Sequence, residues 1–499
     1  MAFDYDLVVI GSTQEGIYAA YKAVLLQARV ALVTQTADDY LDPSGFLPGL
    51  CLSRFVNYLA HQENQTWGLL DNLASENQPE LPSLAQIIQE SQVVQDSIQA
   101  VTSLEKLAFA GVDVIYGQGE FCRLPRQAFL VCDRQLVSRN YLLATGASYV
   151  LPKAVTTISN PVEPEDLKTA SPHLLTPKQL WQDRENSLDR NILLMGNGPR
   201  SIELTQILAR LGHRVTYTTA NKKILPGESA AVNRLFAAQL NSDGVKILVN
   251  APLEKIVTIE NKVLLQLGER ELEAETVVFA HLLQPNIQDL NLQGIGVKSL
   301  DRGIIVNEKL QTSNPAVYAC GDLLGGNSAP HLTQHEVDIV LKNMLAFAWF
   351  KRSYQQIPIA MFTQPNLARI GLTQPPTKSY KKKQIYTVKE YYQSLTSAQI
   401  AGATTGWCEL IVKANGEILG ATIIGDRAVE LINLIALIIQ HKIKLSANPI
   451  RGLLAQDIPY IAPSYGEIFN KLAISFQQAK LQQNKSLRNR LVTWFDWRK

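Results

Sequence analysis

Short apolar runs and amphipathic stretches alternate over the first 34 residues. YDLVVIG (5–11) is a short apolar run, typical of a strand buried on both faces of a parallel sheet. After GSTQEG, the segment IYAAYKAVLLQA has apolar residues at helical spacing, and RVALVT (29–34) is a second apolar run. Strand, glycine turn, helix and strand within about 30 residues predict the βαβ unit that places a dinucleotide pyrophosphate at a helix N-terminus.

The same order of patterns recurs at residues 190–219. This second unit has Gly196 and Gly198 in its turn, with Ser201 where a third glycine is expected, whereas the first turn contributes Gly11 and Gly16. One glycine turn is weak evidence of nucleotide binding. Two turns, each between an apolar strand and an amphipathic helix, predict two dinucleotide sites, or one site and its remnant.

The pattern also changes between and after these units. Residues 61–110 are polar with two amphipathic helical stretches, and a strand-rich segment then runs to 152. Several prolines at 153–177 indicate a linker. From about 356, strand-rich stretches and one long apolar helix predict a separate α+β domain.

Charge and cysteine content exclude some classes of function. A net charge of +2 over 499 residues does not indicate a nucleic acid partner. The longest apolar runs, such as 431–439, are shorter than the roughly 20 residues of a membrane helix, and the N-terminus shows no leader pattern, so we expect a cytoplasmic protein. Five separated cysteines (Cys51, Cys122, Cys132, Cys320 and Cys408) predict neither structural disulfides nor a metal site.

Several motifs carry a family resemblance: ATG at 144–146, TSNPAVYACGD at 312–322, HLTQ at 331–334 and FTQPNLARIGLT at 362–373. Together with the glycine turns, they make residues 4–475 resemble the two-dinucleotide flavoproteins of the disulfide reductase family. That family includes dihydrolipoamide dehydrogenase, glutathione reductase and mercuric reductase. The resemblance implies bound FAD, NAD(P)H as a second nucleotide, and a homodimer formed through the last domain.

The implied fold is α/β, with two Rossmann-like dinucleotide-binding domains and a C-terminal α+β dimerisation domain. The expected divisions are an FAD-binding domain in two parts (1–155 and 286–355), an NAD(P)-binding domain (156–285), a dimerisation domain (356–475) and a basic tail (476–499).

The resemblance also implies which residues hold FAD. Asp322 would lie beside the ribityl and phosphate groups, Leu332 and Thr333 would lie near the flavin ring, and the remaining contacts would come from Gly11, Gly16, Thr145, Gly146 and Gly321. Two positions depart from the pattern. Thr13 replaces the second glycine, where its side chain would crowd the pyrophosphate, and Thr34 replaces the acid that holds the ribose. We still expect FAD, because sites of this size use many backbone contacts.

The thiol machinery of the family is incomplete in this chain. The turn SGFLPGLCLSRF (44–55) aligns Cys51 with the second redox cysteine, and Phe46 with the first. Ala462 stands where the family has its catalytic histidine, although Glu467 remains. Without a second sulfur, no intramolecular disulfide can cycle. Cys51 is therefore either an inert thiol or a thiol that works with an external partner.

The nicotinamide site keeps Gly196 and Gly198 but loses other features. Thr219 replaces the acid that selects NAD, and Lys222 and Lys223 follow it, a pattern that favours NADPH if the lysines are not simply solvated. In AHLLQPN, Leu282 and Leu283 replace the glycine and arginine of the family motif.

Two further features leave alternatives open. Glu203 matches the glutamate that pairs with a lysine beside flavin N5, and with a one-residue gap Arg54 takes the place of that lysine; alternatively, both are structural. Residues 477–499 hold six Lys or Arg and one acid, with Leu487, Leu491, Trp494 and Phe495 on one helical face. This tail would suit an anionic membrane surface, an acidic partner, or packing on its own dimer.

Two functional hypotheses follow. The first is an NAD(P)H-dependent FAD oxidoreductase that passes hydride through the flavin directly to a small acceptor, such as a quinone, oxygen or another nicotinamide. In it, Glu203 and Arg54 are candidate catalytic residues on the N5 side of the flavin, whereas Cys51 is a candidate catalytic residue for thiol chemistry with an external partner. The second is a non-catalytic descendant of the family that acts as a nucleotide-binding or regulatory dimer.

Overall fold

The computed structural model describes most of the chain. The described residues are 3–34, 103–123, 126–152, 173–182, 191–259, 262–281, 283–326, 329–375, 385–445 and 461–497, with scattered helical positions between 86 and 97. They form two compact units: unit 1 holds the described residues up to Pro226 and Ala237–Arg352, and unit 2 holds Gly227–Phe236 and those from Ser353 onward. The candidate residues Cys51 and Arg54 lie outside the described residues, as do Phe46 and Leu282.

The first sheet of unit 1 is parallel, as its apolar strands predict. Its order is β20 (Val317–Ala319), β7 (Ser138–Leu143), β1 (Tyr5–Ile10), β2 (Val30–Thr34) and β3 (Asp113–Tyr116). One face packs on helices α1 (Gln14–Leu25), α4 (Leu104–Phe109) and α9 (Pro330–Leu345). The other face packs on the antiparallel strands β4 (Gly119–Cys122), β5 (Ala128–Val131) and β6 (Arg134–Leu136). Both faces of the sheet are therefore buried.

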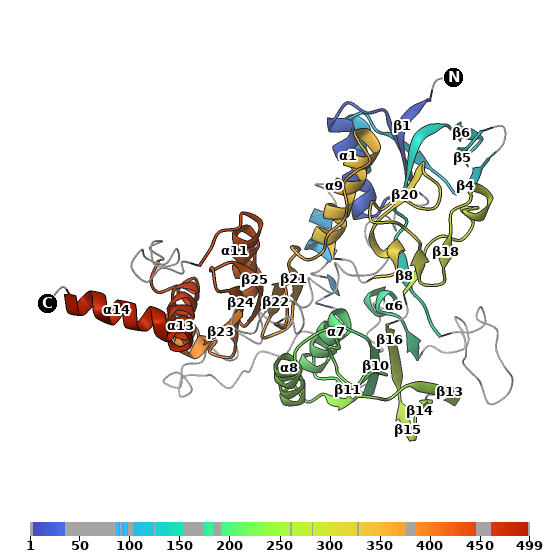
Figure 1. Ribbon diagram of the computed structural model, residues 1–499. Coiled ribbons are helices and arrows are strands. Elements are labelled where there is room, and N and C mark those ends of the chain that lie inside the picture. Colours follow the sequence, from blue (N-terminus) through green and yellow to red (C-terminus); the bar gives the residue numbers. More distant parts are fainter. Residues whose placement is uncertain are drawn as a thin grey trace. The chain divides into compact units, whose positions relative to one another are not determined.

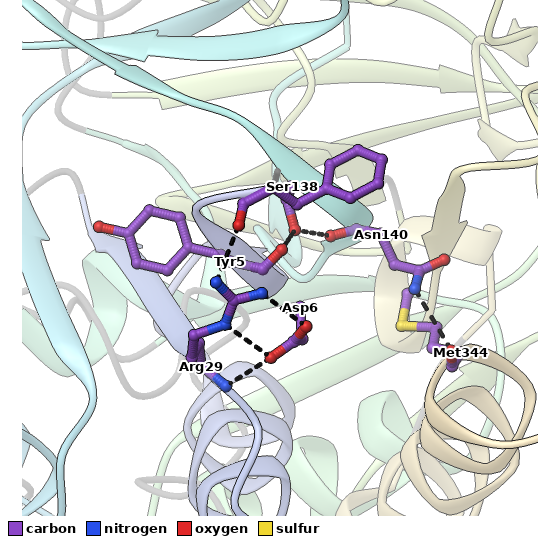
Figure 2. Close-up of polar contacts among 7 residues, drawn as sticks. Tyr5, Asp6, Arg29, Ser138, Asn140 and Met344 are labelled. Atoms are coloured by element: carbon purple, nitrogen blue, oxygen red, sulfur yellow. Dashed lines mark hydrogen bonds and ion pairs between the residues drawn. The ribbon is translucent and has the colours of Figure 1, made fainter. Parts of the chain in front are cut away.

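Polar contacts fix the start of this sheet and the helices on it. In Figure 2, the guanidinium of Arg29 donates to the Asp6 carboxylate (Nη2 to Oδ1, 3.0 Å), and Ser138 Oγ donates to the Tyr5 carbonyl at 3.3 Å. Asn140 Nδ2 donates to the Met344 carbonyl at 3.3 Å, at the end of α9. Helices α1 and α9 lie side by side (Figure 1), joined by Lys22 Nζ and Asp338 Oδ1 at 2.6 Å.

The second sheet of unit 1 repeats this plan. Its parallel order is β12 (Lys246–Leu248), β11 (Arg214–Thr218), β10 (Asn191–Gly196), β16 (Thr276–Ala280) and β9 (Leu174–Leu175). Helix α7 (Pro199–Arg210) joins β10 to β11, and α6 (Pro177–Gln182) precedes β10 in the chain. Helix α8 (Ala230–Ser242) is divided between the units, and its residues from Ala237 onward belong to unit 1. An antiparallel sheet contains β13 (Leu253–Ile259), β14 (Lys262–Leu267) and β15 (Arg270–Ala274).

Short elements complete unit 1. Strand β8 (Ala147–Tyr149) pairs with β17 (Leu283–Pro285), and β18 (Ser299–Leu300) pairs with β19 (Gly303–Ile304). The 3₁₀ turns η1 (Gln293–Ile295) and η2 (Gly321–Leu324) follow β17 and β20.

Unit 2 is α+β, as predicted. Its antiparallel sheet has the order β21 (Ile359–Met361), β22 (Leu367–Gly371), β25 (Ile418–Ile424), β24 (Trp407–Lys413) and β23 (Ile385–Tyr391). Helices α11 (Ala428–Gln440) and α13 (Glu467–Gln483) share its core. The turns η4 (Tyr392–Ser394) and α10 (Thr396–Ile400) lie between strands, and α14 (Lys485–Trp497) ends the described chain. Among the described helices, none is long and apolar enough to cross a membrane.

Candidate functional site

The first glycine turn lies where the strand order of the first sheet reverses, between β1 and β7. Open α/β sheets bind ligands at this point, beyond the carboxyl ends of the strands. Gly11 has φ +104°, and a Cβ on it would lie 2.2 Å from the Ala144 carbonyl oxygen, so the turn requires glycine. Thr13 Oγ1 donates to that same oxygen at 2.9 Å and does not cap α1. The first amides of α1 are therefore left uncapped by the Thr13 side chain.

The end of β2 carries hydroxyl groups in place of the expected acid. Thr34 is 1% exposed, and its Oγ1 lies 2.6 Å from Ser12 Oγ. Sugar hydroxyls could meet these two side chains, but no carboxylate is available from position 34. The hydroxyl pair was not foreseen from the sequence, which identified only the loss of the acid.

Buried carboxylates surround the turn η2. Glu336 Oε2, on α9, accepts a hydrogen bond from the Gly321 amide at 2.8 Å. A Cβ on Gly321 would lie 2.4 Å from Glu15 Oε1, so only glycine fits beside this carboxylate. Burial raises the pKa of the Cys320 thiol well above its usual value, and Glu15 and Glu336 add to the rise. Sequence reasoning missed both acids, although Glu15 lies inside the first glycine turn.

The ATG turn is bonded to the segment that returns from the second sheet. Thr145 Oγ1 donates to the Asn286 carbonyl at 2.5 Å, and Asn286 Nδ2 donates to the Thr145 carbonyl at 3.1 Å. The Asn286 amide donates to the Gly146 carbonyl at 2.9 Å. At the start of α9, Thr333 is buried with its hydroxyl donating to the Pro330 carbonyl, and Leu332 is half-buried.

The second glycine turn is closed by side chains. A Cβ on Gly196 would lie 2.4 Å from both Ser201 Cβ and Tyr217 Cε2, so Ser201 is accommodated because Gly196 has no side chain. Ser201 Oγ donates to the Gly198 carbonyl at 2.7 Å, next to the N-terminus of α7.

Beyond β11, Asn221 Nδ2 donates to Asn197 Oδ1 at 2.7 Å and holds the following loop against the glycine turn. Thr219 is buried, and Lys222 and Lys223 are exposed. The two predicted phosphate-binding lysines are thus accessible to a ligand at this edge of the sheet.

An ion pair joins the start of α7, which follows the second glycine turn, to η2. Arg200, in the first turn of α7, places Nη1 4.0 Å from Oδ2 of Asp322, and the side chains are 14% and 12% exposed. Glu203 follows Arg200 by three residues on α7 and is half-buried. Arg200 therefore places a cation beside the predicted flavin-side residue Asp322, three positions before Glu203 on α7. The sequence analysis missed Arg200, although it lies between Gly198 and Ser201 in the second glycine turn.

His281 lies at the reversal of strand order in the second sheet, between β10 and β16. Its Nδ1 is 3.2 Å from the Met195 carbonyl, which can only accept, so Nδ1 carries the proton. Burial lowers the pKa of His281, and the imidazole is neutral at pH 7 with Nε2 as an acceptor. This residue was also missed, although it lies within AHLLQPN.

These features fit an FAD dinucleotide at the first turn. Gly11 lets the turn pack directly against the Ala144–Thr145 backbone, the start of α1 would offer amides to a pyrophosphate, and Asp322 lies in η2, just after β20. The second turn likewise lies between a parallel strand, β10, and a helix, α7, with Gly196 and Gly198 in it. Within the described residues, no group of three or more His, Cys, Asp or Glu side chains is arranged to hold a metal ion.

The position of the family's histidine is occupied by a residue without a titratable group. Ala462 is exposed, and Glu467 Oε2 accepts a hydrogen bond from the Ser464 amide at 3.3 Å. The retained glutamate therefore contacts the turn before α13. This geometry offers no acid or base at position 462.

Comparison with known proteins agrees with this architecture. Residues 5–361 match the model of the pyridine nucleotide-disulphide oxidoreductase family, and residues 357–474 match its dimerisation domain. A mercuric reductase of Staphylococcus aureus is 26% identical over 88% of this chain and 77% of its own. A dihydrolipoyl dehydrogenase of Chlamydia pneumoniae is 25% identical over 89% of this chain and 92% of its own.

Solved structures show the same fold. The HOCl-induced flavoprotein disulfide reductase RclA from Escherichia coli has a TM-score of 0.76 at 22% identity, covering 94% of this chain and 99% of its own. LpdA from Mycobacterium tuberculosis has a TM-score of 0.77 at 20% identity, with the same coverage.

The family's members are flavin-dependent oxidoreductases that use FAD and NAD(P)H, and its dimerisation domain supports a homodimer. The comparisons confirm the predicted fold class, family and cofactors. The roles of individual site residues stay predictions. Because both family models match and together cover nearly all of it, this chain belongs to the pyridine nucleotide-disulphide oxidoreductase family.

Proposed function

We propose that this chain is an NAD(P)H-dependent FAD oxidoreductase that delivers electrons from the flavin directly to a small acceptor, without a redox disulfide. The acceptor classes are a quinone, dioxygen or another nicotinamide. The observation that carries the proposal is the loss of both parts of the thiol machinery: Phe46 and Cys51 leave one sulfur, and Ala462 leaves no base. The two nucleotide-binding turns are meanwhile retained.

The residues of the chain would bind and orient the nucleotides. The start of α1 and Gly11 would hold the pyrophosphate, and Ser12 with Thr34 would face the ribose. Arg200 would pair with the Asp322 carboxylate beside the first site. FAD, when bound, supplies the hydride-accepting and electron-transferring chemistry. Arg200 and Glu203 would set the charge between the two sites, with Arg54 as the proposed partner of Glu203.

The second nucleotide is proposed to be NADPH rather than NADH. No acid stands at Thr219 to oppose a 2′-phosphate, and Lys222 and Lys223 are exposed in a loop that Asn221 fixes to the glycine turn. Lysine ammonium groups form strong, charge-assisted hydrogen bonds to phosphate.

A second candidate is a non-catalytic nucleotide-binding dimer, and one observation favours it. Glu15 places a buried carboxylate in the first turn of α1, beside Gly321, and a negative charge there opposes a pyrophosphate. Under this candidate, the scaffold and a single nucleotide are retained, but hydride transfer is lost.

The visible spectrum of the purified dimer separates these candidates. A yellow protein that bleaches within seconds of anaerobic addition of NADPH or NADH, and regains colour with a quinone or oxygen, is the result expected for the oxidoreductase. A colourless protein, or a yellow one that neither nucleotide reduces, would contradict it and favour the non-catalytic dimer. The Glu15→Ala variant adds a control, since removal of this carboxylate should strengthen FAD binding.

A further inference from the structure

The C-terminal helix α14 exposes an unusual amount of aromatic surface. Phe495 is 57% exposed and Trp497 is 82% exposed, and Val492 is 53% exposed between rows of polar residues. A shallow surface groove is lined by Ser486, Asn489, Arg490, Thr493, Trp494 and Trp497. Large apolar side chains gathered on a surface generally mark a contact with another molecule or a membrane.

Charged residues on α14 are arranged around the aromatic ones. At about 100° per residue, Arg490 lies in the same row as Trp494 and Trp497, and Arg488 lies in the row of Phe495. Both arginines are exposed. Asp496 lies about 150° around the helix from the midpoint of Trp494 and Phe495. Arg490 and Arg488 thus lie on either side of Trp494 and Phe495, Trp497 lies about 20° beyond Arg490, and the acid lies on the face opposite Trp494 and Phe495.

None of the described α14 side chains belongs to the hydrophobic core of unit 2. Helix α13 runs to Gln483, with Phe476 fully buried and Lys480 Nζ donating to the Ala414 carbonyl at 3.0 Å. The core-forming part of the predicted tail therefore ends with α13, and the amphipathic part begins at Lys485. Figure 1 shows α14 continuing beyond α13 to the C-terminus.

We propose that α14 is an interfacial helix that lies on an anionic lipid bilayer. Its apolar face is rich in tryptophan and phenylalanine, which favour the boundary between headgroups and acyl chains. Arginines along both borders of that face can reach lipid phosphates while their stems stay on apolar surface. The continuous aromatic and basic rows fit a flat anionic surface better than an acidic protein, which would need specific pockets. This inference does not depend on the catalytic proposal.

Cosedimentation of the full-length protein with sucrose-loaded vesicles tests the inference. Binding is expected to vesicles of 70% phosphatidylcholine and 30% phosphatidylglycerol and to be much weaker to phosphatidylcholine alone, with loss at high salt. Arg488→Glu with Arg490→Glu should weaken partitioning about tenfold or more. Trp494→Ala with Phe495→Ala should weaken it similarly. A chain ending at Asn484 keeps α13 intact and should not bind.

The matched control is Arg270→Glu with Arg302→Glu, which makes the same change in net charge at exposed positions of unit 1. It should bind like the unchanged protein. Three outcomes would overturn the inference: equal binding to both kinds of vesicle, unaltered binding by the chain ending at Asn484, or no binding to either vesicle. In the last case, retention on polyglutamate would assign α14 to an acidic partner. A shift from dimer to monomer on removing α14 would assign it to the subunit contact.

Discussion

Two of the described cysteines have fully enclosed thiols. Burial raises the pKa of Cys320 and of Cys408, so both stay protonated and unreactive at neutral pH. Cys132 is exposed, and its Sγ donates to the Tyr116 carbonyl at 3.2 Å. The four described cysteines form no disulfide with one another. Of the five cysteines, Cys51 is the one that aligns with a redox cysteine of the family, so thiol-based electron transfer is tested there.

Replacing Cys51 with serine tests whether this thiol takes part in electron transfer. Direct transfer from the flavin does not need a sulfur, so Cys51→Ser should keep the rate of NAD(P)H oxidation with a quinone or oxygen within about twofold. Stopped-flow reduction and steady-state turnover measure this, with Cys132→Ser as control. A hundredfold lower rate in Cys51→Ser, with no change in Cys132→Ser, would contradict direct transfer and favour thiol chemistry with an external partner.

Lys222 and Lys223 make the nucleotide preference testable. If they hold a 2′-phosphate, changing both to alanine removes two charge-assisted contacts, and KM for NADPH should rise about tenfold while KM for NADH changes less than about twofold. Lys246→Ala, at an exposed position on the neighbouring β12, is the control. Equal changes in both KM values would indicate that the two lysines are simply solvated.

At the scale of elements, the Arg200 and Asp322 pair joins α7 to η2. Both side chains are largely buried, so Arg200→Leu and Asp322→Asn should each lower the free energy of unfolding by about 1–3 kcal/mol. The double variant should lose less than the sum, because the two residues interact. Urea denaturation measures all three.

Helix α7 supplies a matched control for this cycle. Arg210 pairs with Asp243 at 3.4 Å, with side chains 13% and 11% exposed, at the other end of the helix. Arg210→Leu combined with Asp322→Asn should be additive. If the effects of Arg200→Leu and Asp322→Asn on the free energy of unfolding are also additive, the two side chains, 4.0 Å apart, contribute no interaction energy to stability.

His281 links the end of β16 to the end of β10 and predicts a pH dependence. Its pKa is lowered by burial, so the unfolded chain takes up a proton more readily than the folded one. Stability is therefore complete above the unfolded value of 6.5 and is lost as pH falls toward the lower folded value. Each unit between the two values corresponds to about 1.4 kcal/mol.

Urea denaturation at pH 7.5 and 5.5 measures this effect. His281→Asn should lose less stability between these pH values than the unchanged protein. His441→Asn changes an exposed histidine and should lose as much stability as the unchanged protein. An identical loss in all three would mean that protonation of His281 is not coupled to unfolding.

Local patterns predicted the elements, but not the contacts between them. The run at 5–11 contains β1, the helix predicted after GSTQEG is α1, and residues 190–219 contain β10, α7 and β11. These predictions succeeded because apolar runs and glycine turns are patterns of a few neighbouring residues. Two contacts join residues that are far apart in the sequence: 22 residues separate Ser12 from Thr34, and 122 separate Arg200 from Asp322. Hydrophobic periodicity cannot predict such pairs. The predicted positions Asp322 and Glu203 were thus found by motif, and the cation near them only by structure.

At the scale of the whole molecule, the dimerisation domain supports a homodimer, and α11 is a candidate for its contact. Leu434 and Leu437 on this apolar helix are 41% and 56% exposed in one chain. Changing both to glutamate should shift the protein from dimer to monomer, because charges in an apolar contact lose hydration. Light scattering after size exclusion measures the mass.

The control for this experiment is Leu25→Glu with Leu26→Glu, two exposed leucines at the end of α1. That variant should stay dimeric. A dimer that persists in the α11 variant would place the contact elsewhere on the chain.

The two segments that connect the sheets of unit 1 bear on how that unit can move. Strands β8 and β17 pair with each other, and Thr145, Gly146 and Asn286 exchange three hydrogen bonds beside them. A hinge between the sheets would have to bend both segments together or break these bonds. We therefore expect closure on nucleotide binding to be small in amplitude. Capture of NAD(P)H should then need no slow rearrangement of unit 1.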